Sequence, residues 1–168
     1  MPVEKRPEFW SYCMGDLSFP DFQEYLKVCD MIMIPMASLE QHGPHLPVSV
    51  DTDLVNGVVA ASLPHLGDLP VLFLPTQSVG FSPEHQSFAG TLTLKATTVI
   101  AVWTELGEAV AAAGVKKLVF LNAHGGQAAL MDVVGRDLRH RLGMLVYSTN
   151  WYDLPEDPVA SGQLSADE

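Results

Sequence analysis

The sequence predicts an α/β fold in which helices cover a mostly parallel sheet. Short, unbroken apolar runs alternate along the chain with segments whose apolar residues recur every three or four positions. Runs of the first kind are typical of strands buried on both faces, and the second spacing is typical of amphipathic helices. The regular alternation of the two is the order of a doubly wound α/β domain.

Four apolar runs are the predicted strands. Each is short and rich in Val, Ile, Leu, Met or Phe, as expected for a strand without a solvent-facing side. They are residues 31–37 (MIMIPMA), 71–75 (VLFLP), 118–122 (LVFLN) and 144–148 (MLVYS).

Three predicted helices lie between these strands, each marked by one apolar stripe. The second of them is followed by Gly114, a residue suited to closing a helix. The stripes are Val55, Val58, Val59 and Leu63; then Val99, Trp103, Leu106, Val110 and Ala113; then Leu130, Val133, Val134 and Leu138.

Composition favours one domain over residues 1–168 and argues against nucleic acid as a partner. The 168 residues can bury a single core, and the net charge of -11, with nine Lys and Arg, opposes binding to phosphate backbones. Hydrophobic residues make up 48% of the chain and charged residues only 17%, which is rich enough to suggest buried subunit interfaces. We therefore expect a homo-oligomer.

The remaining bulk features suggest the cytoplasm. Two cysteines, Cys13 and Cys29, form neither a metal-ligand spacing nor a disulfide framework. The N-terminus lacks the apolar core of a signal peptide, and no window approaches the roughly 20 apolar residues of a membrane span. No membrane association is expected.

The loop after the first predicted strand gathers titratable side chains, in the segment SLEQHGPHLPVSVDTD. Glu40 and His42 are two residues apart, so in an extended segment both side chains would face the same ion. Asp51 stands where a helix begins, and a rigid proline-containing segment would bring it back toward them. Carboxylate and imidazole are ligands suited to Zn²⁺ or Mn²⁺.

Each of these residues also has a structural interpretation. Asp51 would serve as the N-cap of the following helix, with Asp53 favoured by the helix dipole. His42 and His45 would be loop histidines bonded to backbone. The metal interpretation gains weight from His124, which directly follows another predicted strand and precedes two glycines. The same glycines would suit a phosphate, but no nucleotide-binding glycine motif is present.

Three segments resemble the creatininase (creatinine amidohydrolase) family. The first loop resembles its E-x-H-G-P-H-L-P signature, NAHGGQ is similar to its N-G-H-G-G-N motif, and GFSPEHQSFAGTLTL is similar to a third segment. The resemblance covers about residues 30–150 and implies a three-layer α/β/α fold with two divalent ions, Zn²⁺ or alternatively Mn²⁺. Carried over by position, the ligands are Glu40, His42, Asp51 bridging the ions, and His124.

The resemblance also implies hydrolysis of a C–N amide bond in a small, possibly cyclic, substrate by metal-activated water. Such a reaction needs a proton for the departing nitrogen, and the nearby candidates are His45 and His85. Ser82 matches a family serine in that loop and would contact the substrate. Trp151, after the fourth strand, would form an aromatic wall of the pocket or simply pack. His85 has a structural alternative as a turn residue.

The chain departs from the family pattern in ways that keep a second hypothesis open. Creatininase itself has a glutamate where this chain has Gly126, and other relatives take one from a later H-A-G-x-x-E-T segment that is absent here. Smaller changes are Ala89, Ala123 and Gln127. We therefore expect a chain without the family's last third. The alternative function is a non-catalytic metal-binding or assembly domain.

Overall fold

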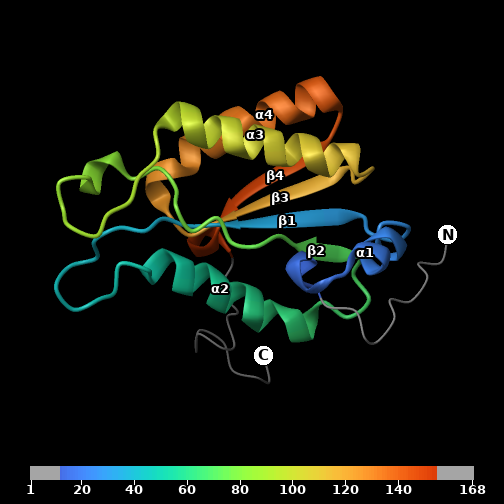
Figure 1. The fold of residues 1–168 in the computed structure, drawn as a ribbon, viewed down its shortest axis with the longest axis horizontal. Coiled ribbons are helices and arrows are strands. Elements are labelled where there is room, and N and C mark those ends of the chain that lie inside the picture. The colour runs from blue at the N-terminus through green and yellow to red at the C-terminus, as the bar shows by residue number, and fades with distance from the viewer. Residues whose placement is uncertain (1–11, 155–168) are drawn as a thin grey trace, which may run out of the picture.

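A four-stranded parallel sheet forms the centre of the protein, in a computed structural model that describes residues 12–154. The strand order is β2-β1-β3-β4, and every neighbouring pair is parallel (Figure 1). All four predicted runs form strands, which confirms the predicted sheet. The strands are β1 (Met31–Met36), β2 (Val71–Phe73), β3 (Lys117–Asn122) and β4 (Leu145–Asn150).

Two strand ends differ from the apolar pattern by two residues, and the other boundaries agree to within one residue. β2 ends at Phe73 rather than at residue 75, and it pairs with β1 over only three positions. The N–H of Leu74 still donates to the carbonyl of Met33 at 2.9 Å, but the next bond to β1 comes only from Gln77, which donates to the carbonyl of Pro35 at 2.9 Å. β4 continues to Asn150, beyond the predicted end at residue 148, because its polar last residues pair in register with β3. Backbone hydrogen bonding, which hydropathy does not report, sets both ends.

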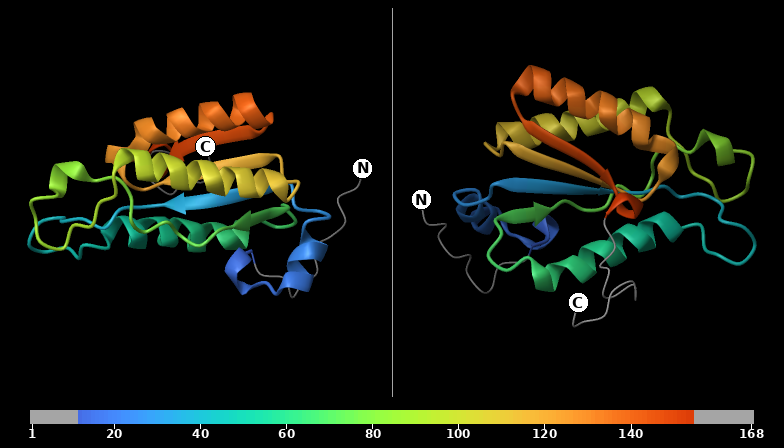
Figure 2. Two further views of the ribbon diagram at one scale, coloured as in Figure 1. Left: turned by 45° about the horizontal axis from the view of Figure 1, so that its top comes forward. Right: turned by 180° about the vertical axis from the view of Figure 1, so that it is seen from behind.

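Helices cover both faces of the sheet, which gives the expected three layers. α2 (Val50–Ser62) lies on one face, and α3 (Ala96–Ala112) and α4 (Ala128–Leu142) lie together on the other, as two opposite views agree (Figures 1 and 2). The short α1 (Phe19–Tyr25) packs near β2, where the Tyr25 hydroxyl donates to the carbonyl of Val71 at 2.9 Å.

The two faces of the sheet bury separate sets of apolar side chains. Alternate residues of β1, Ile32, Ile34 and Met36, join the larger cluster with α3 and α4. The smaller cluster lies toward α2 and contains Ala37, Val55, Leu121 and Ala123, with Met33, Val58, Val59 and Trp151 at its edge. Alternation along each strand therefore supplies both layers.

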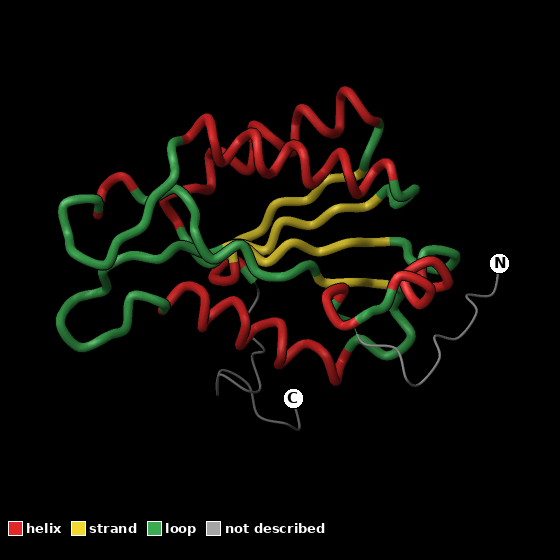
Figure 3. Tube along the Cα trace, in the orientation of Figure 1, coloured by secondary structure: helices red, strands yellow, loops and turns green. Residues whose placement is uncertain are grey.

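The loops that carry the candidate residues gather beyond the carboxyl ends of the strands (Figure 3). β1 leads to β2 on one side, whereas β3 lies on its other side, so the order of strands reverses between β1 and β3. Ligands of open α/β sheets bind at such a reversal. Short 3₁₀ turns complete the loops: η1 (Met14–Asp16), η2 (Leu63–His65), η3 (Pro83–His85), η4 (Gly125–Gln127) and η5 (Trp151–Asp153).

Within residues 12–154, none of the helices combines the length and the apolar character that crossing a bilayer would require. The predicted cytoplasmic location and the predicted homo-oligomer stay predictions.

Candidate metal centre

Three buried side chains from distant segments meet at this edge of the sheet. Glu40, Asp51 and His124 are each at most 5% exposed and offer ligand atoms that lie within 4.8 Å of one another. Nδ1 of His124 is 3.3 Å from Oε1 of Glu40 and 3.3 Å from Oδ2 of Asp51. The loops after β1 and β3 and the first turn of α2 thus contribute one residue each.

Asp51 presents its two oxygens to different histidines. Oδ2 faces His124, whereas Oδ1 lies 3.2 Å from Nε2 of His42. The N-cap interpretation of Asp51 is wrong, because the N-cap residue is Ser49 and Asp51 is buried inside the first turn. Its carboxylate instead has the arrangement of a bridge between two neighbouring positions.

Backbone carbonyls orient both histidine rings. Nε2 of His124 lies 2.9 Å from the carbonyl of Phe81, and Nδ1 of His42 lies 3.2 Å from the carbonyl of Glu40. A carbonyl only accepts, so each of these nitrogens donates its N–H. The lone pair of a neutral ring therefore stands on the other nitrogen, which in both cases faces Asp51.

The electrostatics favour positive charge among these groups. Burial disfavours the ionised Asp51, but hydrogen bonds from His124 and Ser38 outweigh burial and hold the pKa of the carboxyl below its usual value. Burial also disfavours a charged His124, yet the hydrogen bond to Asp51 and the charge of Glu40 raise the pKa of its imidazole. The same groups that favour a proton on His124 would favour a divalent cation at this place.

Two serines support the carboxylates. Ser38 donates to Oδ2 of Asp51 at 2.5 Å, and Ser82, which is fully buried, donates to Oε2 of Glu40. Sequence analysis missed Ser38 because an isolated serine before a loop carries no signal. Ser82 was expected at the substrate; in the structure it holds a candidate ligand, and its contact with substrate stays a prediction.

A buried amide network fixes the loop of His124. Asn122 accepts the backbone N–H of His124 at 3.1 Å and donates to the carbonyl of the same residue at 2.6 Å. Gln127, fully buried, donates to Asn122 at 2.9 Å and accepts the backbone N–H of Phe81 at 3.1 Å. Gln127 entered the sequence analysis only as a departure from a motif, whereas the fold makes it the link between two loops.

His85 approaches the same carboxylate from the loop after β2. Its Nε2 lies 3.9 Å from Oε1 of Glu40, and its Nδ1 lies 2.9 Å from Nε2 of Gln41. The orientation of the Gln41 amide follows from its Oε1, which accepts the backbone N–H of Gly43 at 3.0 Å. The amide nitrogen therefore donates to Nδ1, so a neutral His85 carries its proton on Nε2, toward the cluster.

The structure does not bring the other two expected residues into this cluster. His45 is exposed, and among the described residues it has no hydrogen bond or ion pair with Glu40, Asp51 or His124. Trp151 is half-buried and packs beside the α2 face of the sheet. Trp151 therefore occupies a packing position, which the sequence analysis gave as one of its two possible roles. Roles of His45 and Trp151 in the reaction stay predictions.

The donor set fits divalent metal ions. In the described part of the chain, no Lys or Arg pairs with the buried Glu40 or Asp51, although ionised carboxylates out of water need compensating charge. Two carboxylates and two histidines with correctly placed lone pairs are ligands that Zn²⁺ and Mn²⁺ accept.

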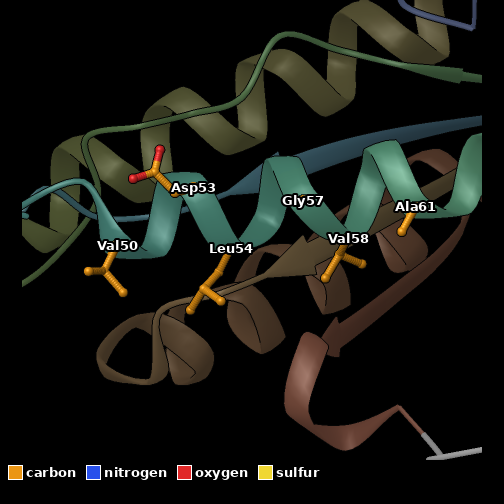
Figure 4. A pocket seen from close by; sticks show the side chains of 6 residues that line it. All are labelled: Val50, Asp53, Leu54, Gly57, Val58 and Ala61. Carbon is orange, nitrogen blue, oxygen red and sulfur yellow. The ribbon is translucent and has the colours of Figure 1, made fainter. Parts of the chain in front are cut away.

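A hollow beside α2 offers no comparable chemistry. Its lining is apolar except for one carboxylate, and it contains neither histidine nor a cationic side chain (Figure 4). The lining residues are Val50, Asp53, Leu54, Gly57, Val58 and Ala61.

The chain belongs to the creatininase family. The family described as creatinine amidohydrolase matches residues 15–168. A mycofactocin precursor peptide peptidase of Mycobacterium tuberculosis (strain CDC 1551 / Oshkosh) is 38% identical over 131 residues, which are 73% of this chain and 51% of that protein. The chain therefore spans about half the length of this relative.

Comparisons at lower sequence identity point to the same family. Creatinine amidohydrolase of Pseudomonas putida is 25% identical over 166 residues, covering 92% of this chain and 63% of that enzyme. A solved manganese form of creatininase superposes with a TM-score of 0.77 at 24% identity, covering 95% of this chain and 65% of the other. These comparisons confirm the resemblance and the three-layer fold.

Proposed function

We propose that this chain carries the two-metal centre of a hydrolase that cleaves a C–N amide bond. The observation that carries the proposal is the meeting of Glu40, Asp51 and His124, with His42 on the other oxygen of Asp51. Family membership supports the same activity, since the related proteins carry the names of an amidohydrolase and a peptide peptidase.

In this proposal Glu40, Asp51 and His124 would hold one ion, and His42 together with Asp51 would hold the other. Solved creatininases described as manganese and zinc-zinc forms support Zn²⁺ or Mn²⁺. When bound, such a pair of ions supplies an activated water and stabilises negative charge that develops on a carbonyl oxygen.

The protein's own residues position the ions and manage the proton. Ser82 and Ser38 hold the two carboxylates, and the carbonyl of Phe81 keeps the lone pair of His124 directed inward. His85, with its proton on Nε2, serves as the acid for the departing nitrogen, and Gln41 sets that tautomer. His45, exposed in its loop, is the second candidate for this role.

The substrate class follows the relatives by degree of identity. The peptide peptidase is 38% identical, whereas creatinine amidohydrolase is 25% identical. We therefore favour an amide bond in a peptide or another small amide over the creatinine ring, with Ser82 and Trp151 as the predicted substrate contacts. The homologues do not favour the alternative of a metal-binding or assembly domain without turnover.

Metal analysis with hydrolysis assays tests the proposal. The purified protein should retain about two Zn²⁺ or Mn²⁺ per chain and hydrolyse at least one member of a panel of peptide and cyclic amides. Asp51→Asn should abolish hydrolysis and lower metal content, because it removes the bridging charge. Asp53→Asn is the matched control, since that exposed carboxylate bonds only to Ser49 among the described side chains. Two bound ions without turnover on any amide would contradict the proposed hydrolysis.

We also propose self-association in the cytoplasm. Leu145 and Tyr147, 59% and 66% exposed, project from the edge strand β4 and support an interface between copies. Light scattering that gives a monomer mass at micromolar concentration would contradict self-association.

A further inference from the structure

One fully buried side chain ties together the loops that carry the candidate ligands. Gln127, in the η4 turn, accepts the backbone N–H of Phe81 at 3.1 Å. Its amide nitrogen donates to the carbonyl of Ala37 at 3.3 Å and to Oδ1 of Asn122 at 2.9 Å. Ala37 directly follows β1, Phe81 lies in the loop after β2, and Asn122 ends β3. The amide therefore links the carboxyl ends of neighbouring strands.

The partners of this amide also fix its orientation. A backbone N–H only donates, so the atom of Gln127 that faces Phe81 is the oxygen, and the nitrogen faces Ala37 and Asn122. Oδ1 of Asn122 is identified in the same way, because the backbone N–H of His124 donates to it at 3.1 Å. A reversed amide would direct its nitrogen at the N–H of Phe81 and lose that bond.

The loop after β2 approaches the amide in space that a side chain would fill. A Cβ added to Gly80 would overlap Oε1 of Gln127 and the carbonyl oxygen of Ala37. Because glycine leaves this space open, the backbone that leads to Phe81 lies directly against the amide. The position of Phe81 therefore depends on the position of Gln127.

Phe81 and Asn122 both hold His124. The carbonyl of Phe81 accepts the N–H of Nε2 at 2.9 Å. Asn122 accepts the backbone N–H of His124 and donates to the carbonyl of the same residue at 2.6 Å. Gln127 thus supports His124 through its ring and through its backbone.

This support decides which nitrogen of a neutral His124 carries the proton. Glu40 and Asp51 each place a carboxylate oxygen 3.3 Å from Nδ1, and both carboxylates attract a proton to that nitrogen. A proton on Nδ1 would remove the lone pair that a metal ion needs. The carbonyl of Phe81 opposes the carboxylates, because it holds the proton on Nε2. If that carbonyl moved, the carboxylates would prevail.

We propose that Gln127 is a positioning residue of the metal centre, which keeps Nδ1 of His124 available to a metal ion by holding the carbonyl of Phe81 in place. This inference rests on the proposed two-metal function. It differs from a packing role, because packing requires only the volume of the side chain and not its amide.

Gln127→Met tests the inference, since methionine has nearly the volume of glutamine but lacks the amide. NMR of the imidazole nitrogens is recorded on the metal-free protein, at a pH where the ring is neutral. It should show the Nε2–H form of His124 in the wild type and a substantial Nδ1–H fraction in Gln127→Met. Calorimetric titration should show that the variant binds Zn²⁺ about 10- to 100-fold more weakly, as for the loss of an outer partner of a metal ligand.

Three further variants separate positioning from stability. Val134→Ala removes buried volume from α4, the helix that follows η4, and should lower stability without changing the tautomer or the Zn²⁺ affinity. Gln23→Met, at an exposed glutamine of α1, should behave as the wild type. Gln127→Glu keeps the length and an oxygen for the N–H of Phe81, so it should retain more of the Nε2–H form than Gln127→Met. Circular dichroism checks the fold of each variant.

The outcomes separate this inference from the proposed function. A wild-type His124 in the Nδ1–H form would overturn the role of Gln127 without reference to any variant. The wild-type tautomer in Gln127→Met would overturn it too, as would an equal loss of Zn²⁺ affinity in Gln127→Met and Val134→Ala. A wild type that binds no Zn²⁺ would overturn the proposed function, whereas the tautomers of the metal-free proteins decide the hold of Gln127 on His124 separately.

Discussion

At the scale of single residues, Asp51 shows how the fold selects between two roles. Its place near a helix start suits a capping residue, but the helix begins at Val50 with Ser49 as the N-cap residue. As placed, it is buried against Ser38, His42 and His124, where an ionised carboxylate is stable only with these partners or with a cation.

Cys29 gives a prediction that depends on pH. Burial raises the pKa of its thiol to about 11. At pH 8 the thiolate fraction should then be about 200-fold below that of an ordinary thiol with a pKa near 8.5. In a Cys13→Ser protein, the reaction of Cys29 with a disulfide reagent should be slower by about that factor than in denaturant. It should also accelerate about tenfold per pH unit beyond pH 9, and a plateau near pH 9 would contradict the raised pKa.

Gly126→Ala should be destabilising even though alanine is a small residue. The new Cβ would lie 2.6 Å from Nε2 of His124, a buried ring held by the carbonyl of Phe81. We expect a loss of about 1–3 kcal/mol in the free energy of unfolding, typical of overpacking, and weaker Zn²⁺ binding. Urea denaturation and zinc titration measure the two effects. A variant as stable as the wild type would show that the loop yields easily.

At the scale of secondary-structure elements, two helices contrast in what their glycines contact. A Cβ added to Gly57 of α2 would meet no atom of residues 12–154 within 4 Å, and this glycine lies on the helix side that carries Leu54, Val58 and Ala61 (Figure 4). Gly107 of α3 faces Leu138 of α4, whose Cδ2 would lie 3.0 Å from an added Cβ. The first glycine has no packing role, whereas the second allows two helices to approach each other.

Alanine at these two glycines should therefore act in opposite directions. Gly57→Ala should raise the free energy of unfolding by about 0.5–1 kcal/mol, because it restricts the unfolded chain and suits a helix interior. Gly107→Ala should lower it by about 1–3 kcal/mol through overpacking between α3 and α4. Urea denaturation of both variants measures the difference, and effects of equal sign would contradict this view of the helix contacts.

At the scale of the whole molecule, metal binding should stabilise the fold. The candidate ligands come from the loop after β1, from α2 and from the loop after β3, so only the folded chain brings them together. A ligand at 100 times its dissociation constant stabilises a protein by about 2.7 kcal/mol, which corresponds to roughly 5–10 °C in a domain of this size. Thermal melting with Zn²⁺ and with a chelator measures the shift.

Two variants define the source of that stabilisation. Asp53→Asn should respond to Zn²⁺ like the wild type, since its exposed carboxylate bonds to Ser49 outside the cluster. Asp51→Asn should lose most of the shift. An equal response from both variants would show that Zn²⁺ stabilises the protein at some other place.

Much of this molecule follows from local patterns. The apolar runs predict all four strands because a strand buried on both faces must be apolar throughout. Glu40, His42, Asp51 and His124 were candidates because their carboxylates and imidazoles lie in segments that follow buried strands and that resemble family motifs. The apolar runs did not predict strand ends such as Phe73 and Asn150, because backbone pairing sets them.

The sequence by itself determined the parallel α/β class and the side chains that suit a divalent ion, because periodicity and residue chemistry are local properties. Only the tertiary structure decided which atoms meet. It assigned one oxygen of Asp51 to each histidine, gave Ser38, Gln41 and Gln127 their supporting roles, and placed Glu84 over Gly126. Those contacts join residues up to 90 positions apart, as in the bond from Gln127 to Ala37, and depend on strand order and loop path, which no short stretch of sequence encodes.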